Sequence, residues 1–279
     1  MLGSISWYQI IELLLVLCIA ASVAGFMAGL LGVGGGLVMV PALYYAFSVL
    51  GYDISSRQHI ALGTSLAIII PTSIMSTRTH MKYGAVDFGL IKSFGLFIVF
   101  GVICGTILAS NLRTANLILF FSIFTFLVAL FFIFLKNKLE ETERNIPKIY
   151  KIIIGTIIGF ISVPLGIGGG SLSVPFMKLF GYDMRKAIGT SAAIGFLIAI
   201  AGTISMISSG TLFADISAPL TLGYFNLPGF LVFVPVTMFM APYGARAVQK
   251  IQKSTVSKVF GIYLLVISVQ SYLQYLKIR

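Results

Sequence analysis

A glycine-rich loop interrupts a long apolar run at two places in the chain. The first copy reads Gly32-Val-Gly-Gly-Gly36 and is followed by Pro41, and the same glycines and proline recur 134 residues later, at Gly166–Gly170 and Pro175. Inside a bilayer, irregular backbone is tolerated only where protein buries it or where it lines a polar cavity. Two such loops in equivalent positions predict two related halves that meet around a common site.

The apolar runs that surround these loops identify an integral membrane protein. Hydrophobic residues make up 58% of the 279 residues and charged residues only 10%. The runs are long and continuous instead of short and alternating, which predicts an all-α membrane fold and excludes a barrel. Cys18 and Cys104 lie in apolar runs without CxxC spacing, so we expect neither a disulfide nor a metal site.

The repeat predicts ten membrane segments arranged as two inverted five-helix repeats. Gly51-Tyr-Asp53 recurs at 181–183 and Gly63-Thr-Ser65 at 189–191. The predicted units are residues 1–135 as the first repeat, 136–148 as a charged cytoplasmic linker, and 149–279 as the second repeat. Helices are expected at about 8–31, 36–50, 60–77, 88–110 and 115–135, and then at 149–165, 170–180, 187–208, 227–248 and 254–273. The segments that start at 36 and 170 are short, as expected of broken helices that follow the glycine loops.

The net charge of +11 reflects membrane topology and not binding to nucleic acid. Five segments per repeat invert the second repeat relative to the first. With the linker in the cytoplasm, 15 Lys and Arg residues fall inside and four outside, at positions 57, 113, 277 and 279. This bias predicts a multi-pass protein of the cell membrane with both termini outside. It also argues against re-entrant hairpins for the two short helices.

The glycine loops have the chemistry of an anion site. Glycine lets a ligand approach the backbone, and the helix that follows offers free N–H groups and the positive end of its dipole. Hydroxyl groups at the Gly-Thr-Ser triplets could donate further hydrogen bonds. The alternatives are that the glycines only allow close helix packing and that the hydroxyls serve as caps or interhelical bonds. The candidate substrate-binding residues are Gly34, Gly35, Gly36, Thr64, Ser65, Gly168, Gly169, Gly170, Ser171, Thr190 and Ser191.

Other polar residues have weaker signals. His80 with Arg78 could form a proton-sensitive gate at the cytoplasmic mouth, and Glu12 could either snorkel to water or couple an ion. Asp53 and Asp183 fit paired roles as gates or as helix caps. No cluster of residues predicts a catalytic centre, a cofactor or a metal.

The duplicated Gly-x-Gly-Gly-Gly with its proline, Gly-Tyr-Asp and Ala-x-Gly-Thr-Ser resemble the TauE/SafE family of membrane transporters, also called the sulfite exporter or toluene sulfonate uptake permease family. The resemblance covers about residues 10–275. It implies transport of a small sulfur-containing or carboxylate anion, such as sulfite or an organosulfonate.

We therefore expect a secondary transporter that moves a small anion by alternating access around the two loops. An anion channel that uses the same loops as a filter is the alternative, and a membrane enzyme is disfavoured. The expected partners are the anionic substrate, the lipid bilayer and a coupling ion, either proton or sodium. The oligomeric state and the direction of transport stay open.

Overall fold

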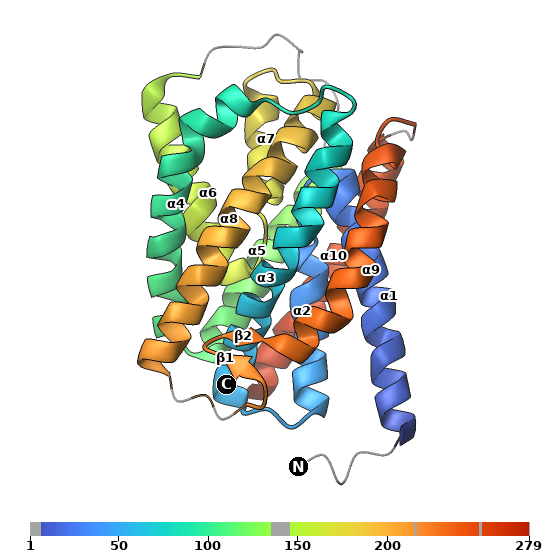
Figure 1. Cartoon of the computed structure of the whole chain (residues 1–279), viewed down its shortest axis with the longest axis vertical. Coiled ribbons are helices and arrows are strands. Elements are labelled where there is room, and N and C mark those ends of the chain that lie inside the picture. The colour runs from blue at the N-terminus through green and yellow to red at the C-terminus, as the bar shows by residue number, and fades with distance from the viewer. Residues whose placement is uncertain (1–6, 135–145, 215, 217, 251–252, 279) are drawn as a thin grey trace.

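The computed structural model describes residues 7–134, 146–214, 216, 218–250 and 253–278, and these form ten helices and one short hairpin (Figure 1). The elements are α1 (Trp7–Leu31), α2 (Gly36–Val49), α3 (Ile54–Met81), α4 (Phe88–Asn111), α5 (Thr114–Phe134), α6 (Lys148–Leu165), α7 (Gly170–Leu179), α8 (Met184–Phe213), β1 (Thr221–Leu222), β2 (Phe225–Asn226), α9 (Leu227–Ala247) and α10 (Lys253–Ile278). Seven of the described helices are long and apolar enough to cross a bilayer, namely α1, α3, α4, α5, α6, α8 and α9. The all-α membrane fold is confirmed.

The third and eighth helices begin earlier than the apolar pattern predicts. Asp53 accepts a hydrogen bond from the backbone N–H of Ser55 at 3.1 Å, and Asp183 accepts one from Arg185 at 2.8 Å. Each carboxylate therefore caps a helix N-terminus, and the polar residues that follow form the first turns of α3 and α8. Of the two roles that the sequence left open for these aspartates, the structure shows the cap.

The two short helices extend only part of the way through the molecule. α2 has 14 residues and α7 has ten, fewer than the roughly 20 that a crossing needs. α2 lies in the lower half of Figure 1 and α7 in the upper half. Tyr150 at the start of α6 contacts Phe180 at the end of α7, with ring centroids 6.0 Å apart, so α6 and α7 return to one face.

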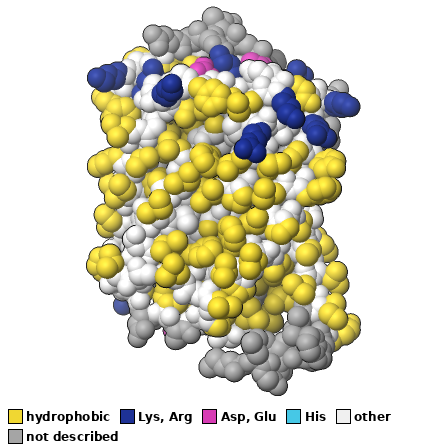
Figure 2. All heavy atoms as spheres, viewed as in Figure 1, with side chains coloured by type: hydrophobic (Ala, Val, Ile, Leu, Met, Phe, Trp, Pro, Cys, Tyr) yellow, Lys and Arg dark blue, Asp and Glu magenta, His cyan; other side chains and the backbone are white. Residues whose placement is uncertain are grey.

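The expectation that the short helices are not re-entrant stays a prediction. A re-entrant pair and two full crossings both bring the chain back to the face it left, so the count of basic residues cannot separate them. The sidedness that the count predicts is unaffected. Figure 2 shows Lys and Arg side chains gathered at the upper end of the face in view, above a broad apolar band.

The helices pack into two bundles that do not coincide with the two halves of the sequence. α1 and α3 pack on α9, and α2 packs on α3; we call α1, α2, α3 and α9 the α1 bundle. α4 packs on α6 and α8, and α7 packs on α8; these four form the α6 bundle. The bundles lie on the right and left of Figure 1 and meet where α3 packs on α8, while α5 packs on α10.

Glycines bring the paired helices of each bundle into backbone contact. A Cβ atom built at Gly29 of α1 would lie 1.9 Å from the carbonyl oxygen of Ala241 in α9, and one at Gly244 would lie 1.9 Å from that of Phe26. In the α6 bundle, Cβ atoms at Gly105 and Gly159 would lie 2.3 and 2.1 Å from carbonyl oxygens of the facing helix. Small residues at such crossings are the common way to pack membrane helices closely.

Candidate functional site

The glycine loops use backbone conformations that favour glycine. Gly32, Gly34 and Gly35 have φ values of 67°, 81° and 81°, and in the second loop Gly166 and Gly169 have values of 62° and 73°. A residue with a side chain rarely adopts such angles. Gly35 and Gly169 immediately precede α2 and α7, so each loop turns directly into a helix N-terminus.

The two loops touch each other in the interior of the molecule. A Cβ atom at Gly36 would lie 2.0 Å from the carbonyl oxygen of Gly166, and one at Gly170 would lie 1.9 Å from that of Gly32. Gly34 faces Gly168, whose Cα atom would lie 3.1 Å from the added Cβ. The predicted meeting of the loops is thus observed, and in this state they pack backbone against backbone.

Two of the predicted serines each bind the glycine loop of the other half of the chain. Ser65 donates to the carbonyl oxygen of Gly166 at 2.8 Å, and Ser191 donates to that of Gly32 at 3.1 Å. Both side chains are fully buried. Ser173 lies 3.1 Å from Ser191 and joins this network. These bonds hold the loops in their closed contact.

The two predicted threonines bind the connections that lead into α9 and α4. Thr64 accepts a hydrogen bond from the backbone N–H of Asn226, and Thr190 accepts one from Asp87, both at 2.9 Å. Asn226 and Asp87 are the N-caps of α9 and α4. The structure therefore gives these hydroxyls an architectural role, and a role as substrate ligands stays a prediction.

Ser171 differs from the other predicted hydroxyl residues. It lies in the first turn of α7 and is 3% exposed, and its hydroxyl has no hydrogen-bond partner among the described residues. A buried polar group without a partner costs free energy, commonly about 1–3 kcal/mol, so such a group calls for an explanation. A ligand that binds at the start of α7 would provide one.

His80 lies deeper than a gate in a loop would. It belongs to the last turn of α3, is fully buried, and its Nε2 lies 2.9 Å from the carbonyl oxygen of Gly29 at the end of α1. The expected loop position is wrong because α3 continues to Met81. His80 thus joins α3 to the helix that carries the first glycine loop. Glu12 is exposed on α1, which agrees with the snorkelling interpretation.

Within the described part of the chain, no group of His, Cys, Asp and Glu is placed to hold a metal ion. Cys18 and Cys104 are free thiols in α1 and α4. The site is therefore made of backbone groups and hydroxyls.

Comparison with known proteins agrees with this architecture. The family model described as "Sulfite exporter TauE/SafE" matches residues 17–271. A probable membrane transporter protein of Haemophilus influenzae is 33% identical over 262 residues, covering 93% of this chain and 98% of that protein. Probable membrane transporter protein YunE of Bacillus subtilis is 30% identical, covering 91% of this chain and 96% of the relative. Probable membrane transporter protein MJ0441 of Methanocaldococcus jannaschii is 26% identical, with 92% and 97% covered.

Proposed function

The chain belongs to the sulfite exporter TauE/SafE family and is a multi-pass membrane transporter, and from this premise we propose that it carries a small sulfur-containing or carboxylate anion by alternating access. The proposed binding site is the pair of glycine loops with the first turns of α2 and α7. The two halves of the chain are proposed to be inverted repeats.

The observation that carries this proposal is the unpartnered hydroxyl of Ser171. The first turn of a helix has N–H groups without intrahelical partners and carries the positive end of the helix dipole. Ser171 adds a buried donor at the same place, next to the left-handed Gly169. An oxyanion placed there would satisfy the hydroxyl and the free N–H groups together.

The closed contact of the loops represents an occluded arrangement in this proposal. An anion can enter only if the loops separate, and separation breaks the bonds of Ser65 to Gly166 and of Ser191 to Gly32. Both hydroxyls would then be available to donate to the anion instead. The exchange of loop carbonyls for substrate oxygens keeps the number of buried hydrogen bonds nearly constant.

The packing also supports an inverted repeat. In a repeat, α1 to α5 correspond in order to α6 to α10. The contact between α4 and α6 then predicts an equivalent contact between α9 and α1, and the contact between α3 and α9 predicts one between α8 and α4. All four contacts occur. Thr64 and Thr190 accept hydrogen bonds from corresponding N-caps at the same distance of 2.9 Å.

The substrate is first identified by a thermal-shift screen of the purified protein against sulfite, thiosulfate, sulfonates and small carboxylates, because a ligand of the folded state raises its apparent stability. Transport of the stabilising anion is then measured in proteoliposomes for Ser171→Ala and for Thr125→Val. Thr125 of α5 also has a buried hydroxyl without a partner, so it is a matched control. Loss of one hydrogen bond to a charged ligand predicts a KM roughly tenfold higher for Ser171→Ala.

A KM for Ser171→Ala equal to that of the control would refute the site at α7. Flux that rises without saturation as substrate is increased would instead identify a pore. Imposed proton and sodium gradients applied separately identify the coupling ion.

A further inference from the structure

His80 is a buried histidine in the last turn of α3 for which the proposed function has no role. Its side chain is fully buried, and its Nε2 lies 2.9 Å from the carbonyl oxygen of Gly29 in α1. A carbonyl oxygen only accepts hydrogen bonds, so in the neutral ring Nε2 carries the proton and Nδ1 carries a lone pair. The neutral ring therefore fits this position through one hydrogen bond.

The second ring nitrogen of His80 has no bonding partner. Nδ1 is buried and makes no hydrogen bond with another described residue. In the protonated ring, Nδ1 becomes a second N–H donor and the ring carries a positive charge. Burial disfavours a charge, and it disfavours a donor that lacks an acceptor. The arrangement in the structure therefore accepts the neutral imidazole and disfavours the imidazolium.

The surroundings of His80 bring no carboxylate to the ring. The last two turns of α1, residues 24–31, contain no titratable residue. The charged and titratable groups of the α3 end, of the α3–α4 connection (residues 82–87) and of the α8 start are Arg78, Lys82, Tyr83, Asp87, Arg185 and Lys186. Asp87 is the one carboxylate among them, and it pairs with Lys186 at 3.5 Å and caps α4. In α9, which packs on α1, Arg246 lies over the ring of Tyr243. None of these groups bonds to the imidazole.

The backbone of His80 holds the α3–α4 connection against α8. Its carbonyl oxygen accepts hydrogen bonds from the N–H groups of Tyr83 and Ala85, both at 3.1 Å. A Cβ atom built at Gly189 of α8 would lie 2.2 Å from the carbonyl oxygen of Ala85 and 3.1 Å from the Cβ atom of His80. One residue along α8, Thr190 accepts a hydrogen bond from the N–H of Asp87. Movement of His80 would therefore loosen the connection from α8.

The side chain of His80 reaches in the other direction, to the helix that leads into the first glycine loop. Gly29 lies in the last turn of α1, and the N–H of Gly32 bonds to the carbonyl oxygen of Ala28 at 3.1 Å. The carbonyl oxygen of Gly32 accepts a hydrogen bond from Ser191 of α8. His80 thus lies between the closed loop contact and the α3–α4 connection.

We infer that His80 is a proton-binding site whose occupation opens the α3–α4 connection. The closed arrangement holds the neutral ring, and the protonated ring is stable where the connection has left α8 and water reaches Nδ1. The ligand is a proton from the face that the charge count predicts to be cytoplasmic. Because the open arrangement binds the proton better, protonation shifts the population toward it. A role of this proton as the coupling ion rests on the proposed function, whereas opening on protonation does not.

The size of the shift follows from the linkage between proton binding and opening. An imidazole in water takes up its proton at about pH 6.5. If only the open arrangement binds the proton, the closed arrangement is fully stable above about pH 6.5 and loses stability as the pH falls below it. Lowering the pH from about 7.5 to about 5.5 then raises the open fraction about tenfold.

Hydrogen exchange of residues 85–90 measures this opening without substrate or transport. The full chain in phosphatidylcholine nanodiscs is followed by mass spectrometry at the two pH values. Each rate is divided by the rate of the unfolded chain at the same pH, which removes the intrinsic pH dependence of exchange. The variant His80→Gln keeps an N–H donor for Gly29 and has no imidazole to protonate.

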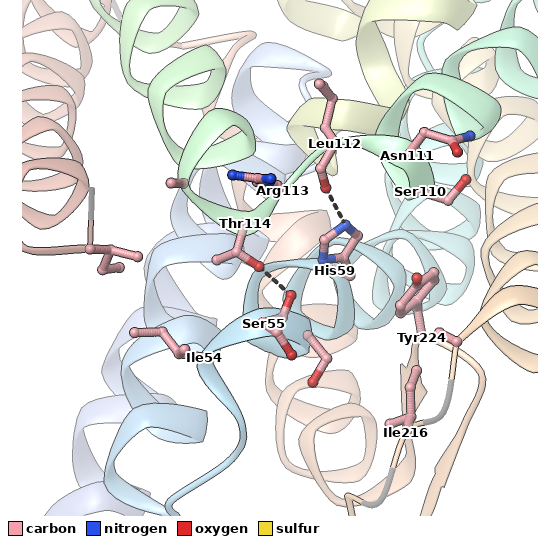
Figure 3. Close-up of a pocket in the computed structure, with 14 residues that line it drawn as sticks. Ile54, Ser55, His59, Ser110, Asn111, Leu112, Arg113, Thr114, Ile216 and Tyr224 are labelled. Atoms are coloured by element: carbon pink, nitrogen blue, oxygen red, sulfur yellow. Dashed lines mark hydrogen bonds between the residues drawn. The ribbon is translucent and has the colours of Figure 1, made fainter.

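His59, the other of the two histidines in the chain, provides the matched control. It also lies in α3, is 4% exposed, and its Nδ1 likewise has no partner among the described residues. Its Nε2 lies 3.0 Å from the carbonyl oxygen of Leu112, beside a cavity of about 500 Å³ near the start of α3 (Figure 3). His59→Gln therefore removes a buried imidazole at the other end of α3.

We expect the corrected exchange of residues 85–90 to rise about tenfold on acidification in the wild-type protein and in His59→Gln, and to be independent of pH in His80→Gln. A wild-type rate that does not change, a response that persists in His80→Gln, or one that disappears in His59→Gln overturns the inference. If His80→Gln does not fold, His59→Gln carries the test, because His80 is then the only histidine in the chain. Neither anion nor flux enters the measurement, so a failure of the Ser171 prediction leaves this result intact.

Discussion

Single glycines at the contact of the two loops are predicted to tolerate no side chain. In Gly170→Ala the new Cβ atom would lie 1.9 Å from the carbonyl oxygen of Gly32, which belongs to the backbone of the other loop and cannot move aside. Overpacking of this kind costs about 1–3 kcal/mol or more, so the apparent melting temperature should fall. The measurement is thermal unfolding of the purified protein in detergent.

Gly202→Ala is the control for this prediction. A Cβ atom at Gly202 of α8 would lie 3.0 Å from Cδ1 of Leu66, the end of a flexible side chain. Since alanine also favours a helix interior over glycine, we expect little change or a small gain in stability. Equal melting temperatures for the two variants would contradict the close loop contact.

Which residues gather at the loops could be predicted from the sequence, but the partners of their side chains could not. Duplication singled out the glycines and the Gly-Thr-Ser triplets, and Ser65 and Ser191 do contact the loops. Adjacent positions on α3 and α8 point in different directions, so Thr64 and Thr190 face the caps of α9 and α4 instead. The direction in which each of these side chains points is decided only by how helices distant in the sequence pack together.

At the scale of elements, the connections into α4 and α9 would act as matched seals of the proposed transport path, one at each end of the molecule. The carbonyl oxygens of Tyr224 and Ala85 would lie 2.3 and 2.2 Å from Cβ atoms at Gly63 and Gly189, so each connection lies directly on a Gly-Thr-Ser triplet. The threonine of that triplet then binds the cap that follows the seal. A transporter that alternates access must release one such seal at a time.

Thr64→Val and Thr190→Val should loosen the two seals separately. Valine keeps the shape but leaves a buried N–H without its acceptor, which costs about 1–3 kcal/mol. We expect the Asn226 amide to exchange its hydrogen roughly 5–100-fold faster in Thr64→Val, and the Asp87 amide to do so in Thr190→Val. Hydrogen exchange followed by mass spectrometry over residues 221–229 and 85–90 measures both.

Each of these variants is the control for the other. Faster hydrogen exchange at both connections in either variant would show that the threonine stabilises the whole protein and does not hold one connection in place. No change in either would show that the hydroxyls contribute nothing to closure.

At the scale of the whole molecule, the unit of packing differs from the unit of sequence repetition. The sequence predicted two successive five-helix repeats, and alternating access between such units would rock one repeat against the other. In the structure α4 packs on α6 and α8, and α9 packs on α1 and α3, so each bundle takes one helix from the other half. Such an exchange leaves no trace in hydropathy or spacing, because α4 and α9 present apolar surfaces in either arrangement. The bodies that move in transport should therefore be the α1 bundle and the α6 bundle.

Cross-links between and within the bundles separate these two schemes of motion. The first pair is Leu66 of α3 and Gly202 of α8, which face each other across the interface between the bundles. The second pair is Phe97 of α4 and Gly155 of α6, which face each other inside the α6 bundle. A Cβ atom built at Gly155 would lie 3.1 Å from the Phe97 Cβ atom. Each pair is replaced by cysteines in a background with Cys18→Ala and Cys104→Ala, and mercuric ion bridges the thiols.

We expect the bridge between α3 and α8 to stop transport in proteoliposomes and a thiol reductant to restore it, because the loops can separate only if the bundles move apart. The bridge between α4 and α6 joins helices of different sequence repeats yet should leave transport largely intact, since both would move together as parts of the α6 bundle. Rocking of the two sequence repeats predicts the opposite result for this second pair, because it would shear α4 past α6. Transport that survives the α3–α8 bridge would instead place the moving boundary elsewhere in the molecule.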